Sequence, residues 1–183
     1  MVAVAGVSGT LLAPLLAQRA QSRSTAAEFE RQERARLMQW RREQVRDELA
    51  QRQACYVATN AAFRRYRTQL MEYLWWVHHD VTDTEKRQRL EDARLTHHAA
   101  LAEAQMIASS DVLDELDEVA KLLSDTYRKI MYLHEGNPEP DGSFEEIGSH
   151  LVWLWERWKK MREVMRADLG DSNRSALPSD AAP

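Results

Sequence analysis

Residues 15–135 contain neither glycine nor proline. These two residues interrupt helices more strongly than any others, glycine through its backbone freedom and proline through its missing N–H group. A segment of this length without either is typical of long helices that are joined by short polar turns. The sequence therefore predicts an all-α chain.

Turn signals divide the chain into four predicted helices. The first runs from about Thr25 to His79 and ends at the polar run 80–83, and a second short polar run at 109–111 ends the next helix. Gly136, with prolines two and four residues later, closes the third helix. Ser143 and Glu146 have the spacing of a capping box and open a fourth helix, which we expect to end at Gly170.

The apolar residues of the first helix repeat as a heptad from Met38 onward. The second, third and fourth helices are much shorter, so antiparallel packing can cover only the second half of the first one. We expect an up-down four-helix bundle with a long first helix that extends as a coiled-coil stalk. Alternatively, a break near Thr59 and Asn60, both weak helix formers, lets the stalk fold back onto the bundle. The heptad positions are Met38, Val45, Tyr66 and Tyr73 at d, and Leu49, Tyr56, Phe63, Leu70 and Val77 at a.

The chain divides into four predicted regions. They are an apolar N-terminal segment (1–18), a basic helical stalk (19–54), the helical bundle (55–169) and a disordered tail (170–183) rich in Ser, Ala, Asp and Pro. Within the stalk, Met38, Val45 and Leu49 have no predicted partner in their own chain, and an exposed apolar seam normally finds another helix. We therefore expect a homo-oligomer that forms through the stalk.

The N-terminal segment has the pattern of a membrane anchor. Residues 2–17 carry no charge, and Arg19 and Arg23 follow directly, where they would contact anionic lipid headgroups. The positive-inside rule then predicts a single-pass protein on the inner face of the cell membrane, with a cytoplasmic C-terminal region. The alternative is an apolar helix buried in protein, and a cytoplasmic chain.

Composition excludes several classes of function. The net charge of −4 argues against nucleic-acid binding. Cys55 is the only cysteine, so an intramolecular disulfide, a thiolate zinc site and a CxxC redox pair are all excluded. The chain has no catalytic or cofactor motif, and we predict neither an enzyme nor a cofactor.

The N-terminal third resembles a known group. The apolar N-terminus, the arginine flank, the run 40–44 (Trp-Arg-Arg-Glu-Gln) and the run 52–56 (Arg-Gln-Ala-Cys-Tyr) before Phe63 are similar to small, uncharacterised, membrane-anchored helical proteins of high-GC bacteria. The resemblance implies an anchor and a helical fold, and implies nothing about chemistry.

Six histidines raise the possibility of a metal site. An up-down bundle brings one end of each helix to a common level, where imidazole and carboxylate ligands gather. Histidines at helix C-termini are equally well explained by the helix dipole, and no metal-binding motif is present. We therefore predict no metal site, and we expect His97 to be a hydrogen-bonded core residue. The candidate ligands are His78, His79, Asp80, His134 and Glu145.

Two tryptophans depart from the apolar pattern. Trp75 and Trp153 fall at positions that face away from the predicted core, and tryptophan is enriched at binding hot spots. We predict a partner surface around them, with Trp76 and Trp155 at its edges. The alternative is a wider apolar face on which these rings lie flat against neighbouring helices.

These patterns together predict a membrane-tethered helical scaffold or protein-interaction module. Its stalk would self-associate, and its bundle would present a surface to a protein partner that the sequence does not identify. The alternative is a soluble ligand- or metal-binding helical bundle, with or without an enzymatic activity, that uses the end rich in histidine and carboxylate.

Overall fold

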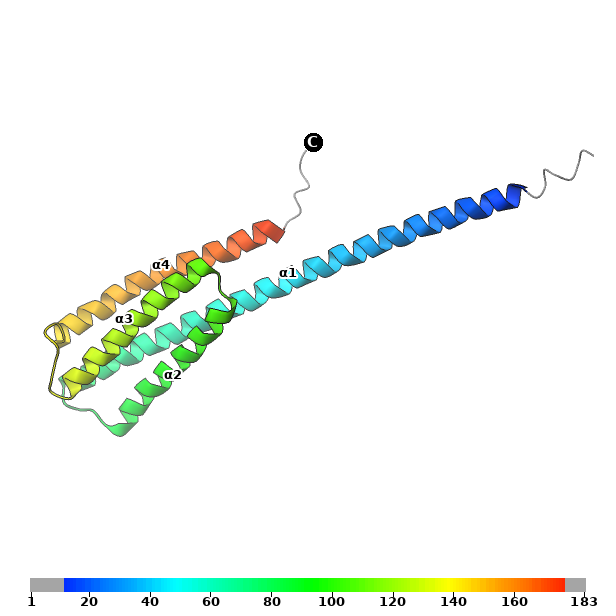
Figure 1. Ribbon diagram of the computed structural model, residues 1–183. Helices are drawn as coiled ribbons and strands as arrows, with labels where there is room; N and C mark the ends of the chain where they lie inside the picture. Colours follow the sequence, from blue (N-terminus) through cyan, green and yellow to red (C-terminus); the bar gives the residue numbers. More distant parts are fainter. Residues whose placement is uncertain (1–11, 177–183) are drawn as a thin grey trace, which may run out of the picture. The chain divides into compact units, whose positions relative to one another are not determined.

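The computed structural model describes residues 12–176, and side chains are described for residues 28–170. The described part of the chain consists of four helices and has no strand. The helices are α1 (Leu12–His78), α2 (Thr84–Ile107), α3 (Ser110–His134) and α4 (Phe144–Ala176) (Figure 1). The prediction of an all-α chain is confirmed.

The helix boundaries carry the predicted caps. The Asp83 carboxylate accepts the backbone N–H of Lys86 at 2.8 Å, which caps the first turn of α2. At α4, the Ser143 N–H donates to the Glu146 carboxylate (3.1 Å), and the Glu146 N–H donates to the Ser143 hydroxyl oxygen (3.3 Å). The capping box is therefore confirmed. Gly136 follows α3 with a φ of 73°, a left-handed conformation that favours glycine.

Two boundaries differ from the sequence prediction, and the alternative break in the first helix is absent. Helix α1 begins at Leu12 instead of Thr25, and it passes through Thr59 and Asn60 without the break considered above. Helix α4 continues past Gly170 to Ala176. Local helix propensity is a weak term of at most about 1 kcal/mol per residue, so neighbouring turns and tertiary contacts override it. Residues 1–11, which hold most of the predicted anchor, and residues 177–183 lie outside the described part.

Tertiary contacts explain why the weak helix formers stay helical. The Thr59 hydroxyl donates to the Cys55 carbonyl within its own helix (2.9 Å). The Asn60 side-chain oxygen accepts the indole N–H of Trp158 in α4 (2.6 Å). Both polar groups are therefore satisfied inside the helical conformation and do not compete with it.

The chain separates into two compact units, residues 1–46 and 47–183. In the second unit, α1 and α4 run antiparallel, because residue numbers in contact rise along one helix as they fall along the other. Asn60 bonds to Trp158, and Arg67 Nε donates to the carbonyl of Leu151.

Further contacts join the other helices of this unit. Between α2 and α3, Glu91 accepts the hydroxyl of Tyr127. Between α3 and α4, Glu115 pairs with Lys160 (3.0 Å), and Thr126 contacts His150 (3.0 Å). The α3 and α4 contacts therefore show that these two helices also run antiparallel.

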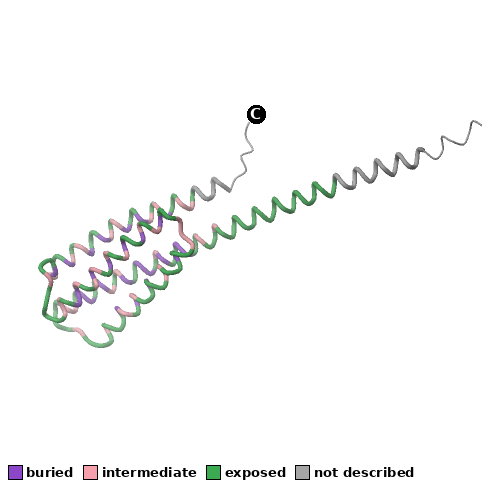
Figure 2. Tube along the Cα trace, viewed as in Figure 1, coloured by how far each residue is buried: buried purple, intermediate pink, exposed green. Residues whose placement is uncertain are grey.

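The core of the second unit draws on all four helices, and Figure 2 shows buried positions along each of them. Its centre includes the fully buried ring of Trp158, which stacks on Phe63 with centroids 3.8 Å apart and ring planes 5° apart. Burying an apolar side chain of this kind contributes about 1.5–3 kcal/mol. The predicted heptad residues Tyr56, Phe63 and Leu70 all lie in this core.

The described residues of the first unit all belong to α1. Every side chain described in it, from residue 28 to residue 46, is exposed. Between residues 12 and 176, no helix combines the length and the apolar character that a membrane crossing requires.

Candidate interaction surfaces

The first candidate surface is the seam of the stalk. Met38 is 62% exposed and Trp40 is 58% exposed. Val45 is also exposed, and Leu49 is half-buried. Met38, Val45 and Leu49 are spaced seven and four residues apart, which places them on one line along the helix. The structure therefore has a line of apolar side chains that its own described residues leave largely uncovered.

The four predicted partner-surface tryptophans divide into two pairs. Trp75 and Trp153 are each 49% exposed, as their positions outside the heptad predict. Trp76 and Trp155 are half-buried and pack against the core. Trp76 contacts Tyr73 edge-on, and the ammonium group of Lys86 lies 5.5 Å from its ring centroid.

The two predicted partner-surface tryptophans of α4, Trp153 and Trp155, lie on different sides of that helix. Trp153 stacks on His150, whose ring contacts Thr126 of α3. Trp155 lies beside arginines of α1. Two residues along a helix are about 200° apart, so one flat surface cannot present both rings. Whether either ring binds a partner stays a prediction.

The candidate metal ligands form ring contacts with aromatic neighbours. His78 stacks on Phe144 with centroids 4.0 Å apart, and His79 stacks on Trp75 at the same distance. His134 lies beside Tyr73 at 5.8 Å. Within residues 28–170, no three His, Cys, Asp or Glu side chains gather closely enough to hold a metal ion.

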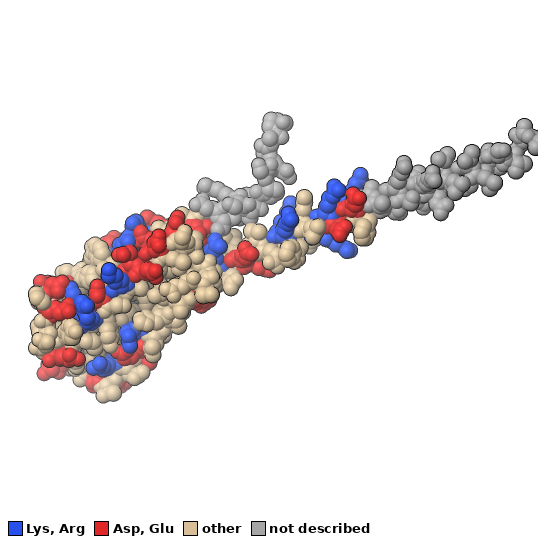
Figure 3. Space-filling view, viewed as in Figure 1, with Lys and Arg blue, Asp and Glu red and all other residues tan. Residues whose placement is uncertain are grey.

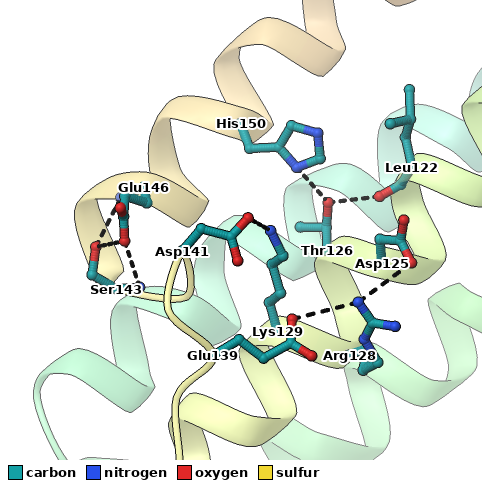
Figure 4. A network of polar contacts seen from close by, with 10 residues as sticks. All are labelled: Leu122, Asp125, Thr126, Arg128, Lys129, Glu139, Asp141, Ser143, Glu146 and His150. Carbon is teal, nitrogen blue, oxygen red and sulfur yellow. Dashed lines mark hydrogen bonds and ion pairs between the residues drawn. The ribbon is translucent and has the colours of Figure 1, made fainter.

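Polar contacts fix the loop between α3 and α4 at that end of the bundle (Figure 4). Lys129 of α3 pairs with Asp141 of the loop. Arg128 of α3 pairs with Glu139 of the loop at 3.4 Å. A hydrogen bond and the positive charge of Lys129 lower the pKa of Asp141, and hydrogen bonds from Ser143 lower that of Glu146. Because these pairs are exposed, they position the loop more than they stabilise the fold.

A small hollow of about 270 Å³ lies beside this loop. Figure 4 shows the His150 ring directed toward Thr126, whose hydroxyl donates to the Leu122 carbonyl (2.7 Å) and therefore accepts from His150 Nδ1. Burial lowers the pKa of His150, with the charge of Lys129 acting in the same direction. The basic group that lines the hollow, Lys129, is already paired with a carboxylate, so the hollow has no evident unpaired charge to offer a ligand.

His97 lies in the core, as predicted, but its hydrogen bonding differs from the prediction. The residue is 3% exposed, its ring lies 5.4 Å from that of Tyr66, and its Nδ1 atom has no hydrogen-bond partner. Burial lowers its pKa from 6.5 to about 4, and the charge of His98 acts in the same direction. The sequence could not show this, because the burial of the ring depends on packing against other helices, including Tyr66 of α1.

Sequence reasoning missed a cluster of arginines around Trp155. The guanidinium carbons of Arg64, Arg67 and Arg162 lie 5.8, 5.3 and 5.5 Å from the centroid of its ring. Two of these arginines come from α1 and one comes from α4. Burial lowers the pKa of Arg67, and Arg162 Nε is buried without a hydrogen-bond partner.

Charged side chains of both signs alternate over the face of the bundle shown in Figure 3. Many charged side chains of the described bundle are paired, including Arg94 with Glu91 (2.8 Å) and Arg157 with Glu115 (2.7 Å). The arginines around Trp155 are therefore unusual within the described bundle, because their contacts are with a ring and not with a carboxylate.

No protein-family model, curated protein or solved structure matches this chain. The arguments for its function therefore rest on the surfaces described above.

Proposed function

We propose that this protein is a helical scaffold or interaction module that self-associates through its stalk as a parallel coiled coil. In this proposal each copy carries an up-down four-helix bundle. The exposed tryptophans Trp75 and Trp153 of the bundle are available to a protein partner. The antiparallel contacts of α4 with α1 and with α3 support the bundle arrangement.

One observation carries the proposal: the two halves of the same seam differ in burial. Tyr56, Phe63 and Leu70 lie at one set of heptad positions and are at most 4% exposed, because α2, α3 and α4 cover them. Met38 and Val45 continue the heptad toward the N-terminus and are exposed. A second copy of the same helix would cover them as the bundle covers the rest.

Cysteine cross-linking tests this arrangement in the intact protein. In a parallel coiled coil, equivalent d positions of two copies face each other, so Met38→Cys should form a disulfide-linked dimer under mild oxidation. The native Cys55 is buried and should not react. Gln44→Cys is the matched control, because Gln44 is exposed on a different face of the same helix.

The proposal expects a band of doubled mass for Met38→Cys and little of it for Gln44→Cys. Adding Val45→Glu to Met38→Cys should remove the band, because a charge at the next d position is costly to bury. Equal cross-linking at both positions would indicate random collision, and no cross-linking at either would refute the parallel pairing.

A membrane tether at residues 1–18 remains part of the proposal. Its support is the uncharged run before Arg19 and the resemblance of the N-terminal third to membrane-anchored helical proteins. The test is fractionation of cells that express the full chain or a version lacking residues 1–18, with carbonate washing of the membranes. Retention of the full chain alone supports the tether, and loss of both from the washed membranes contradicts it.

The ligand- or metal-binding alternative has weaker support. It needs His78, His79 and His134 to converge on one ion, whereas each of these rings contacts an aromatic side chain. Metal analysis of the purified protein tests it directly, since stoichiometric metal would favour it over a scaffold.

A further inference from the structure

We propose that the arginine cluster around Trp155, formed by Arg64, Arg67 and Arg162, is a binding site for a phosphate group. This site lies in the bundle and is independent of the stalk. Nothing in the self-association proposed above requires it.

The first step of the argument is that these charges lack partners along their own helices. Carboxylates three or four residues away are the usual partners of helical arginines. At those distances Arg64 has only Ala61, Asn60, Arg67 and Thr68. Around Arg162 the corresponding residues are Trp158, Lys159, Met165 and Arg166, and around Arg67 they are Phe63, Arg64, Leu70 and Met71.

The second step is that neighbouring helices supply no carboxylate either. Across residues 28–170, no ion pair involves any of the three arginines, although eleven such contacts join other residues. Three positive charges around one ring therefore remain without a neutralising partner in a chain whose net charge is −4. Guanidinium groups gathered around one ring repel one another, and a bound anion would relieve that repulsion.

The third step concerns the geometry of the contact. A guanidinium group over an aromatic ring is attracted by the negative face of the ring, and this contact leaves N–H groups available for an anion. The ring thus holds the arginines near one another without neutralising them. Arg67 is further fixed because its Nε donates to the Leu151 carbonyl at 2.9 Å.

The fourth step is an adjoining hollow of about 220 Å³ between α1 and α4. Arg162 lines this hollow and also contacts Trp155, so it joins the two features. Its Nε is buried and has no hydrogen-bond partner within the described chain, which leaves a donor for an incoming oxygen atom. Arg166 and the amides of Gln53 and Asn60 also line the hollow.

A phosphate group suits this set of donors better than a carboxylate does. It carries about −1.5 to −2 charges at neutral pH and has three strong acceptor oxygens. Arginine binds such groups through two parallel N–H donors, which makes it well suited to phosphate recognition. The source of the phosphate is either a small soluble molecule or a lipid headgroup, and the experiment below separates the two.

The test is titration calorimetry of the full chain with inorganic pyrophosphate, together with flotation on vesicles that contain phosphatidic acid or only phosphatidylcholine. Arg64→Gln is the deciding variant, because Arg64 is exposed and its replacement leaves the core intact. Arg65→Gln is the matched control: the residue is adjacent and exposed, and it contacts no ring in the described chain. Arg162→Gln is the second variant, with thermal unfolding as the check of its fold.

We expect the wild type and Arg65→Gln to bind pyrophosphate alike, and Arg64→Gln and Arg162→Gln to bind at least about tenfold more weakly, as the loss of a charged hydrogen bond requires. If the extra flotation on phosphatidic acid shows the same pattern while pyrophosphate does not bind, the phosphate belongs to a lipid. If neither probe binds, or if Arg64→Gln and Arg65→Gln weaken binding equally, the site does not exist.

Discussion

His97 offers a quantitative test of the packing described here. Its imidazole is almost completely buried between helices, and the Nδ1 atom lacks a hydrogen-bond partner. Burial lowers its pKa from 6.5 to about 4. We expect this one residue to make the bundle sensitive to mild acid.

The sign of the effect follows from which state binds the proton. Below about pH 6.5 the unfolded chain protonates this imidazole, while the folded chain does so only near pH 4. Protonation therefore favours unfolding, and the loss of stability begins as the pH falls below 6.5. Each pH unit in that window costs about 1.4 kcal/mol, so the whole window costs about 3 kcal/mol. At pH 7 the effect is absent.

The perturbation is His97→Leu, which keeps a side chain of similar bulk and removes the titrating group. We expect its free energy of unfolding at pH 7 to lie within about 1 kcal/mol of the wild-type value. Between pH 6.5 and pH 4 the variant should become more stable than the wild type by about 3 kcal/mol. Thr96→Ala, an exposed and non-titrating position next to His97, is the control and should keep the wild-type dependence on pH.

The assay is urea denaturation followed by circular dichroism at several pH values between 7 and 4. The difference between variant and wild type isolates His97 from the other titrating groups, because those are common to both chains. If the free energies of unfolding of His97→Leu and the wild type changed in parallel with pH, the reasoning would be refuted. That result would mean that the imidazole is solvated or partnered when the chain is folded.

Three further predictions concern the bundle. Trp158→Ala should lower the free energy of unfolding by about 3–5 kcal/mol, whereas Trp153→Ala should lower it by less than about 1 kcal/mol, because only the former ring is buried. Glu115→Gln should destabilise the protein at pH 7 by up to about 1 kcal/mol, and this difference should shrink as the pH falls below 4.5. Ser143→Ala should cost about 1 kcal/mol by removing the cap of α4. Urea denaturation measures all three.

The pH dependence expected for Glu115 follows from its contacts. Burial acts to raise its pKa, but the hydrogen bond from Lys160 and the charges of Arg157 and Lys160 together lower it. A carboxylate whose pKa is lower in the folded chain than in the unfolded chain stabilises the folded state at any pH above its unfolded pKa. This stabilisation is lost as the pH falls through its folded pKa. If the free energies of unfolding of Glu115→Gln and the wild type differed by the same amount at pH 7 and at acid pH, the lowered pKa of Glu115 would be contradicted.

The stability of Trp153→Ala also tests whether Trp153 belongs to the partner surface. A large loss of stability in Trp153→Ala would place that ring in the core and remove it from the proposed partner surface. If the variant folds normally, recovery of partners in a pull-down then tests the surface itself.

Equal loss of stability for Ser143→Ala and for Ser124→Ala, a serine within α3, would show that the cap is not responsible.

Much of the helical structure could be predicted from the sequence because its signals are local. The absence of glycine and proline, the Asp83 cap, the Ser143 and Glu146 capping box and Gly136 each act within a few residues of one another. Such signals depend only on backbone geometry and on hydrogen bonds to the nearest turn. The end of α4 was predicted wrongly because a single glycine costs only about 1 kcal/mol within an otherwise helical segment.

The sequence alone left the surfaces undecided, because they depend on which helix faces meet. Trp155 was expected at the edge of a partner surface, whereas the packing of α4 against α1 places two arginines from α1 beside its ring. The burial of His97 likewise depends on other helices, such as α1, whose Tyr66 ring lies 5.4 Å from the imidazole.

Periodicity therefore determined that the chain is helical and which stripe of each helix is apolar. Tertiary structure alone decided which charges meet a carboxylate and which meet an aromatic ring. The reason is physical: helix formation is governed by neighbours within one turn, whereas the pairing of side chains depends on the rotation and register of helices that are distant in sequence.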